Sequence, residues 1–200
     1  VNVPNKKKII IKKIKIPLIG IHNIRNSVAA AAVALTVGIS LQDIKRGLLN
    51  FKGVQRRFNK IFTYNKTDFY DDYAHHPTEI KVVLDGVKKV YKNYEKICIF
   101  QPHRLSRLKD LRKEFSLAFK NADIVVLCPI YTAGEKIKLN FNYLNFAREI
   151  IKNSKVKLFL VKDNMHLAKF IKKNIYGKKI VIGMGAGSIS NWMRKIPQLI

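Results

Sequence analysis

The sequence predicts an α/β protein built on a doubly wound, mostly parallel sheet. From residue 60 onward, short apolar runs alternate with longer segments whose apolar residues recur at helical spacing. Such alternation is typical of a parallel sheet covered by helices on both faces. The chain has 200 residues, of which 48% are hydrophobic, so it holds enough apolar surface for one core or slightly more.

Residues 1–58 look like the tail of another domain. They predict a strand over 6–16, a turn ending at Gly20, a helix over 22–37 that Gly38 stops, and a second helix over 41–51 that Ser40 caps. So few elements cannot bury a core of their own. We therefore expect a boundary near Phe58, with 53–58 as a linker and 59–200 as a complete α/β domain.

The expected elements of the second domain follow one another in regular order. Strands are predicted over 60–65, 67–73, 96–103, 122–130, 155–161 and 178–186. Helices are predicted over 76–94, 107–122, 142–153, 165–175 and 188–196, and Pro77 suits the first turn of the first of these.

Polar side chains gather where these strands end, which is where open α/β sheets bind ligands. One strand is followed by two carboxylates and two imidazoles, the next by an imidazole and two guanidinium groups, and a third by a phenol and a carboxylate. These residues are Asp71, Asp72, His75 and His76, then His103, Arg104 and Arg107, then Tyr131 and Glu135. The last strand runs into GMGAGS, whose glycines lack dinucleotide-fingerprint spacing and indicate a turn with close backbone approach.

Arg104 and Arg107 are three residues apart at the start of a predicted helix, so both can face one ligand. A pair of guanidinium groups suits a carboxylate or a phosphate. The alternative is a surface ion pair with Asp110 or Glu114.

Two further sets of residues have the chemistry to bind a nucleotide. His22, Asn23 and Asn26 open the alanine-rich helix, where Asn amides either read a purine edge or merely cap the helix. Arg56 and Arg57 in the linker either reach a phosphate or are simply solvated.

Other classes of function fit the sequence less well. A zinc site from Asp72, His75, His76 and His103 would need adjacent histidines to ligate one ion, so no metal site is expected within this chain.

The net charge of +26 raises nucleic acid as a partner, but the lysines are spread over the whole length without an RNA- or DNA-binding motif. No apolar run is long enough to span a membrane. Cys98 and Cys128 lie in apolar runs, as buried thiols of a cytoplasmic protein would.

Six motifs follow one another along the chain in this order: GIHNIRN, GVQRRF, DDYAHHPTEI, FQPHRLSR, IYTAGE and GAGSI. Together they resemble the Mur ligase family over essentially the whole chain. The resemblance implies that His22, Asn23 and Asn26 contact adenine, that Arg57 approaches the ATP phosphates and that Asp72 lies near the ribose. It further implies that His75 lines the catalytic site and that His103, Arg104 and Arg107 surround the incoming amino acid.

The implied reaction is an ATP-dependent ligation in peptidoglycan synthesis. The carboxylate of UDP-N-acetylmuramate becomes an acyl phosphate, the amine of L-alanine attacks it, and Mg²⁺ shields the phosphates. No GxxxxGK[ST] phosphate loop occurs in these residues, and the chain starts with Val1 rather than Met. We therefore expect the UDP-sugar domain, the phosphate loop and most Mg²⁺ ligands to lie upstream, and the isolated chain to be inactive. The alternatives are a non-catalytic remnant that binds nucleotide or amino acid, and a basic nucleic-acid-binding module.

Overall fold

The computed structural model describes residues 10–18, 20–135 and 141–200. Of His22 it describes the backbone and not the side chain. The chain divides into two compact units, Val1–Val54 and Gln55–Ile200. This division falls slightly before the expected boundary near Phe58. The linker residues from Gln55 onward therefore belong to the second unit.

The first unit contains two helices, α1 (Ile21–Thr36) and α2 (Leu41–Asn50). They pack through a small cluster of Ala31, Leu35 and Ile44. Ser40 caps α2 by accepting a hydrogen bond from the Asp43 amide at 3.1 Å, and Gly38 ends the α1 region with a φ of 87°, as the sequence predicts.

The strand expected over residues 6–16 is wrong for the part of it that the structure describes. Residues 10–16 have no strand assignment, and the rest lies outside the described residues. A strand is stabilised by the ladder of a neighbour, and each of the six strands in the described sheet belongs to the second unit.

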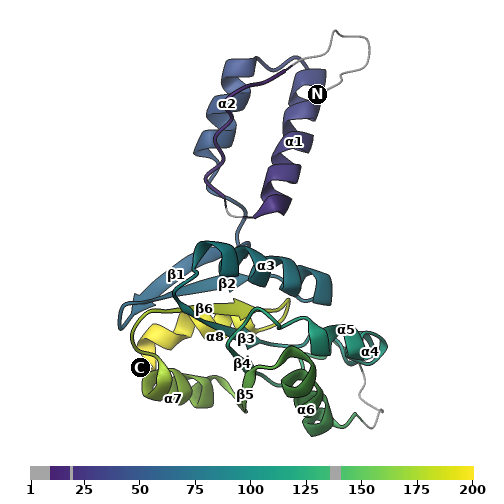
Figure 1. Cartoon of the computed structure of the whole chain (residues 1–200), viewed down its shortest axis with the longest axis vertical. Coiled ribbons are helices and arrows are strands. Elements are labelled where there is room, and N and C mark those ends of the chain that lie inside the picture. Colours follow the sequence, from purple (N-terminus) through teal and green to yellow (C-terminus); the bar gives the residue numbers. More distant parts are fainter. Residues whose placement is uncertain (1–9, 19, 136–140) are drawn as a thin grey trace. The chain divides into compact units, whose positions relative to one another are not determined.

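The second unit is a six-stranded sheet with helices on both faces, so the predicted fold class is confirmed (Figure 1). The strand order is β1-β2-β6-β3-β4-β5. β1 runs antiparallel to β2, and all other pairs are parallel. The strands are β1 (Asn59–Tyr64), β2 (Thr67–Asp72), β3 (Glu95–Phe100), β4 (Ile124–Leu127), β5 (Lys157–Leu160) and β6 (Lys179–Met184).

Six α-helices of the second unit surround this sheet: α3 (Pro77–Val90), α4 (Leu105–Asp110), α5 (Arg112–Leu117), α6 (Tyr143–Ser154), α7 (Asn164–Asn174) and α8 (Ile189–Lys195). The single helix expected over 107–122 is divided, because Leu111 has φ −110° and ψ 26° and leaves the helical region between α4 and α5. A short 3₁₀ turn, Ile196–Gln198, follows α8. None of the described helices is long and apolar enough to cross a bilayer.

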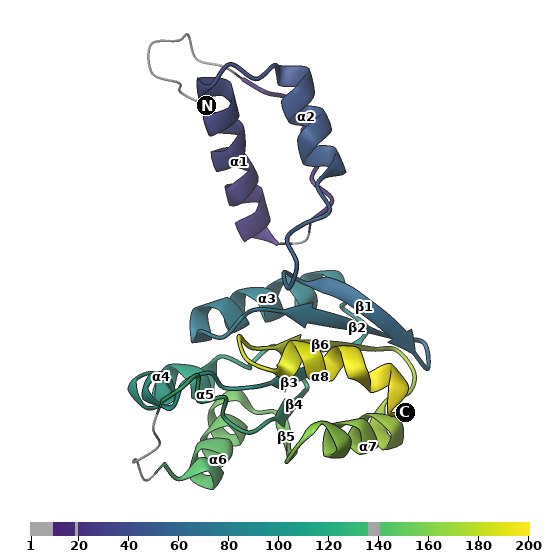
Figure 2. The same cartoon turned by 180° about the vertical axis from the view of Figure 1, so that it is seen from behind.

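Alternation along the strands builds one core on each face of the sheet. Phe100 and Ile182 join α3, α4, α5 and α6 in one cluster, whereas Ile99 and Val181 join α7 and α8 in the other. The two faces can be followed in Figures 1 and 2. Because β6 lies between β2 and β3, the carboxyl ends of all three strands meet at one edge.

We expect Phe119→Ala to lower the free energy of unfolding by about 3–5 kcal/mol, because this ring is fully buried against Phe100 and its loss leaves a cavity. Phe159→Ala is the matched control, since Phe159 is 41% exposed on the edge strand β5. It should cost about 1 kcal/mol or less. Urea unfolding of both variants measures the difference, and equal losses would contradict the assignment of the core.

Candidate functional site at the carboxyl edge of the sheet

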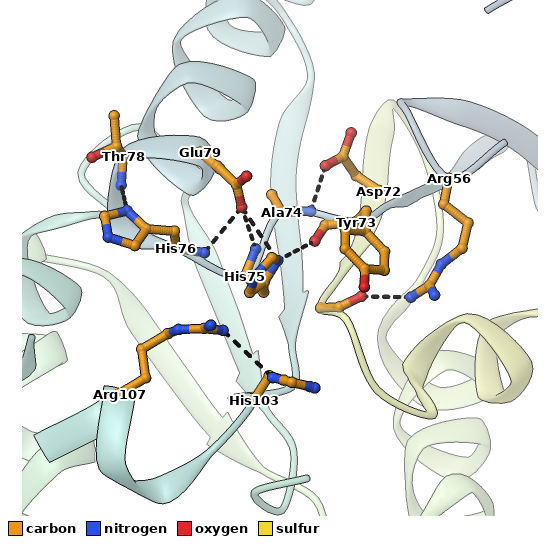
Figure 3. A network of polar contacts seen from close by, with 11 residues as sticks. Arg56, Asp72, Tyr73, Ala74, His75, His76, Thr78, Glu79, His103 and Arg107 are labelled. Carbon is orange, nitrogen blue, oxygen red and sulfur yellow. Dashed lines mark hydrogen bonds and ion pairs between the residues drawn. The ribbon is translucent and has the colours of Figure 1, made fainter. Parts of the chain in front are cut away.

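The loop after β2 places both of its histidines at the start of α3. His76 is the N-cap residue, and its Nδ1 accepts from the Thr78 amide at 3.3 Å. Glu79 reaches back and accepts from the amides of His75 (3.0 Å) and His76 (3.1 Å), which completes a capping box (Figure 3). Because His76 and Glu79 cap α3, the ring of His75 takes no part in capping and is directed to the sheet edge.

The ring of His75 is oriented by its own loop. Its Nδ1 lies 3.0 Å from the Tyr73 carbonyl oxygen and 3.3 Å from a Glu79 carboxylate oxygen. Both partners are acceptors, so Nδ1 carries a hydrogen, and Nε2 is the acceptor whenever the ring is uncharged. Burial would raise the pKa of Glu79, but the two amides and the charges of His75 and Arg57 outweigh it and hold that pKa below its usual value.

Asp72 fastens the linker to the end of β2. One carboxylate oxygen accepts from the Phe58 amide and the other from the Ala74 amide, each at 2.8 Å, while its carbonyl accepts from the Gly185 amide at 3.2 Å. The side chain is only 3% exposed, and burial raises its pKa to about 6 against the effect of the two amides. Asp72, which the resemblance places near a ribose, is therefore a buried residue whose two carboxylate oxygens both accept hydrogen bonds from backbone amides.

The two linker arginines lie differently. Arg56 donates from Nη2 to the Gly185 carbonyl at 2.6 Å and stacks 4.6 Å from the centroid of Tyr73 (Figure 3). Its own carbonyl accepts from the Tyr73 amide at 2.7 Å. Arg57 has an exposed side chain, and within the described residues its hydrogen bond is from the backbone amide to Asn59. Arg57 is thus the one of the two with a guanidinium available to a ligand.

The loop after β3 brings the predicted amino-acid residues to the same edge. The Nδ1 atom of His103 accepts from Arg107 at 3.4 Å, and the His103 ring lies 5.7 Å from that of His75. Arg104 has a φ of 68° and an exposed side chain. Burial lowers the pKa of His103, and the charges of Arg107, His75 and Arg104 lower it further, so the ring is neutral at neutral pH.

Aromatic rings form a continuous row across this edge, although β6 separates β2 from β3. Tyr73 contacts His75 (5.2 Å between centroids), His75 contacts His103, and His103 stacks on Tyr131 at 5.6 Å. β6 is followed by Gly185, Ala186 and Gly187, whose small size leaves the space beyond the strand end to the rings of its neighbours. Three strand ends therefore converge as predicted.

Asp71 points to the opposite face of the sheet from Asp72. It is fully buried and accepts from the Ser190 hydroxyl at 2.5 Å and from Arg194 at 3.4 Å, both on α8. Its second oxygen has no hydrogen-bond partner among the described residues. Asp71 thus ties α8 to β2 and is not part of the rim.

The predicted adenine residues belong to the first unit and are not placed relative to the others. α1 starts after Gly20, which has no side chain to cap the helix. Asn26 is exposed. The side chain of His22 lies outside the described residues. In the part of the chain that is described, no three His, Cys, Asp or Glu side chains converge as a metal site would require.

The match to known proteins agrees with this geometry. The family model for the Mur ligase glutamate ligase domain matches residues 56–187. The chain belongs to the Mur ligase family. This matched segment begins at the linker arginine that stacks on Tyr73 and ends at the glycine turn after β6, so it contains all the rim residues described above.

Three relatives place this Mur ligase chain more closely. It is 71% identical over its whole length to the UDP-N-acetylmuramate–L-alanine ligase of Pelagibacter ubique, of which it covers 43%. It is 41% identical over 94% of its length to the ligase of the same name from Rickettsia canadensis, of which it covers 40%. A crystal structure of the Thermotoga maritima UDP-N-acetylmuramate–alanine ligase matches with a TM-score of 0.76 and 28% identity, over 92% of this chain and 39% of that one. The chain therefore spans about two fifths of the length of these relatives.

Several residues that shape the rim were not identified from the sequence. Glu79 follows His76 by three positions, and this capping-box spacing is a signal that could have revealed it. Gln101 is 3% exposed and binds the turn after β6 through Ser188 and Ile189. Nothing in the local sequence pairs Gln101 with residues so far along the chain.

The raised pKa of Asp72 predicts a specific pH dependence of stability. Its folded pKa of about 6 lies above the ordinary 3.8, so the folded state binds the proton more tightly than the unfolded state. The contribution of Asp72 to the free energy of unfolding should therefore fall as pH rises from about 4 to about 6, by on the order of 3 kcal/mol, and stay constant above.

Denaturant unfolding of the chain and of Asp72→Asn at a series of pH values measures this contribution as a difference. The variant lacks the ionisation but keeps the shape of the side chain. The free energy of unfolding of the parent chain minus that of Asp72→Asn should fall between pH 4 and pH 6. If this difference is independent of pH, or rises over that range, the raised pKa of Asp72 is contradicted.

Proposed function

We propose that this chain supplies the amino-acid site and part of the ATP site of a ligase that joins L-alanine to UDP-N-acetylmuramate in peptidoglycan synthesis. The observation that carries the proposal is the 71% identity, over the entire chain, to a ligase of that name. The cationic rim at the carboxyl edge of the sheet supports it, because both the amino-acid carboxylate and the ATP phosphates are anions.

His103, Arg104 and Arg107 would hold the amino acid. In the part of the chain that is described, Arg104 makes no side-chain hydrogen bond or ion pair, and the partner of Arg107 is the neutral ring of His103. The expected alternative, surface ion pairs with Asp110 or Glu114, is not formed. Both guanidinium groups thus keep their charge available to a carboxylate.

Arg57 would approach the ATP phosphates, and Asn23, Asn26 and His22 would contact adenine. Asp72 would serve ATP indirectly, since its buried carboxylate fixes the linker that carries Arg57. ATP supplies the phosphoryl group that activates the sugar-nucleotide carboxylate. The Mg²⁺ ligands are expected mostly in sequence outside these residues, together with the phosphate loop.

His75 would act on the attacking amine. Its Nδ1–H is held by Tyr73 and Glu79, so Nε2 is directed away from the loop as an acceptor for an amine hydrogen. The amino-acid residues lie beside it on the neighbouring loop. Fixing the amine against the activated carboxylate lowers the barrier mainly through alignment, which is worth up to about 7–11 kcal/mol.

The remaining parts of the proposal concern the chain by itself. Without a phosphate loop, the isolated chain is expected to show no ATP-dependent ligation. The cytoplasmic setting and the absence of a specific nucleic-acid partner stay predictions. Calorimetry of the isolated chain with ATP and with L-alanine separates a binding remnant, which gives heat, from a chain that needs its upstream domains to bind at all.

We expect Arg104→Ala to raise the KM for L-alanine about 10-fold to 100-fold, since losing a hydrogen bond to a charged group costs about 1.5–3 kcal/mol. The test protein is a chimera in which this chain replaces the matching part of the Pelagibacter ubique ligase. Phosphate release is measured with ATP, UDP-N-acetylmuramate and varied L-alanine.

Arg148→Ala on α6 is the matched control, because Arg148 is exposed and its side-chain hydrogen bond within the described residues is to the neighbouring Asn145. It should leave the KM for L-alanine unchanged. An unaltered KM in Arg104→Ala would refute the carboxylate role, and a chimera without L-alanine ligation would refute the proposed function itself.

A further inference from the structure

The loop after β4 holds the residues predicted to bind the amino acid. The amide of Arg104 donates to the Tyr131 carbonyl at 2.8 Å, and the amide of Tyr131 donates to the Pro102 carbonyl at 2.8 Å. These bonds form a parallel bridge between His103 and Tyr131. Above the bridge the two rings are stacked, with 21° between their planes. Backbone and side chain of Tyr131 thus both contact the segment that carries His103 and Arg104.

The base of the Tyr131 ring lies against Gly187. A Cβ atom added at Gly187 would lie 2.5 Å from Cγ of Tyr131 and 2.6 Å from Oε1 of Gln101, closer than Cβ atoms approach other atoms. Gly187 is therefore required by this close approach, not by a positive φ. The turn that contains it is fixed by Gln101, whose Oε1 accepts from the Ile189 amide at 2.9 Å and whose Nε2 donates to Ser188.

Glu135, four residues after Tyr131, holds the next part of the same segment. Its carboxylate accepts from the amides of Leu105 (2.7 Å) and Ser106 (3.2 Å) and from the Ser106 hydroxyl. The hydrogen bond from that hydroxyl lowers the pKa of Glu135, so the carboxylate stays charged at neutral pH. Arg104 lies between the two attachments with its φ of 68°, a conformation that a non-glycine residue keeps only when its surroundings impose it.

We propose that Tyr131, supported by Gly187, is a positioning residue that sets the place of His103 and Arg104 for the incoming amino acid. This inference rests on the proposed function. Tyr131 acts through the stacked ring and the bridge. Its side chain lies between the residues predicted to bind the amino acid and the turn after β6. Disturbing it should therefore weaken amino-acid binding and leave ATP binding unaffected, because in the described part of the chain Tyr131 makes no hydrogen bond or ring contact with Arg57 or Asp72.

The test uses the same chimeric ligase with three substitutions. Gly187→Ala pushes on the ring, Tyr131→Ala removes it, and Tyr131→Phe retains the stack. We expect the first two to raise the KM for L-alanine about 10-fold to 100-fold, as a misplacement of about 1 Å does, with the KM for ATP within about twofold. Tyr131→Phe should behave as the parent, since its hydroxyl has no partner among the described residues. Gly47→Ala is the control glycine, with nothing near its added Cβ.

Failure of this inference is distinguishable from failure of the proposed function. If Arg104→Ala raises the KM for L-alanine but Gly187→Ala and Tyr131→Ala do not, the positioning role is overturned and the proposed function stands. If Tyr131→Phe is as damaging as Tyr131→Ala, the stacked ring is not the cause. If Arg104→Ala also has no effect, the carboxylate role of Arg104 fails and this inference with it, whereas the proposed function itself fails only if the chimera shows no L-alanine ligation.

A second measurement covers the case in which Gly187→Ala does not fold. NMR titration of His103 in Tyr131→Phe and Tyr131→Leu compares a ring with an aliphatic side chain. The pKa of His103 should match the parent in the first and rise toward the ordinary value in the second, because loss of the ring exposes the imidazole to water. Equal titration in both variants overturns the inference.

Discussion

The rim depends on the buried carboxylate of Asp72. A carboxylate accepts several hydrogen bonds at once, and this one joins the amide of Phe58 in the linker to that of Ala74 in the loop before α3. Its backbone carbonyl simultaneously binds Gly185 after β6. The linker, the loop before α3 and the turn after β6 therefore meet at one residue. Burying a charged group is unfavourable, and the fold tolerates it here because both oxygens are satisfied by amides.

The role of Asp72 shows where reasoning from the sequence was sufficient and where it was not. Alternation of apolar runs predicted the parallel sheet, and DDYAHHP after one strand and PHR after the next predicted two neighbouring parts of a rim. These inferences needed only local pattern and the rule that carboxyl ends bind ligands. They did not show that Asp71 and Asp72 face opposite sides of the sheet, with one bound to α8 and the other to the linker.

The parts that the sequence did not predict are long-range contacts. The strand expected near the start of the chain has the right composition but no partner strand in the described sheet. Gln101 and Gly187 have no distinctive pattern in their local sequence, and their importance arises from packing between segments more than fifty residues apart. The two linker arginines are adjacent and chemically identical, yet only the three-dimensional contacts separate Arg56, which is engaged, from Arg57, which is exposed.

The central place of β6 also bears on the order in which the molecule can assemble. β6 follows the other five strands of the described sheet along the chain, yet it lies between β2 and β3 and pairs with both. Until it emerges, the β1–β2 hairpin and the β3–β4–β5 half of the sheet have no strand to join them, and both expose unpaired edges. A nascent chain in that state must wait for β6 before the rings of His75 and His103 can meet. Chaperone protection would be needed most during this interval, since exposed strand edges favour aggregation.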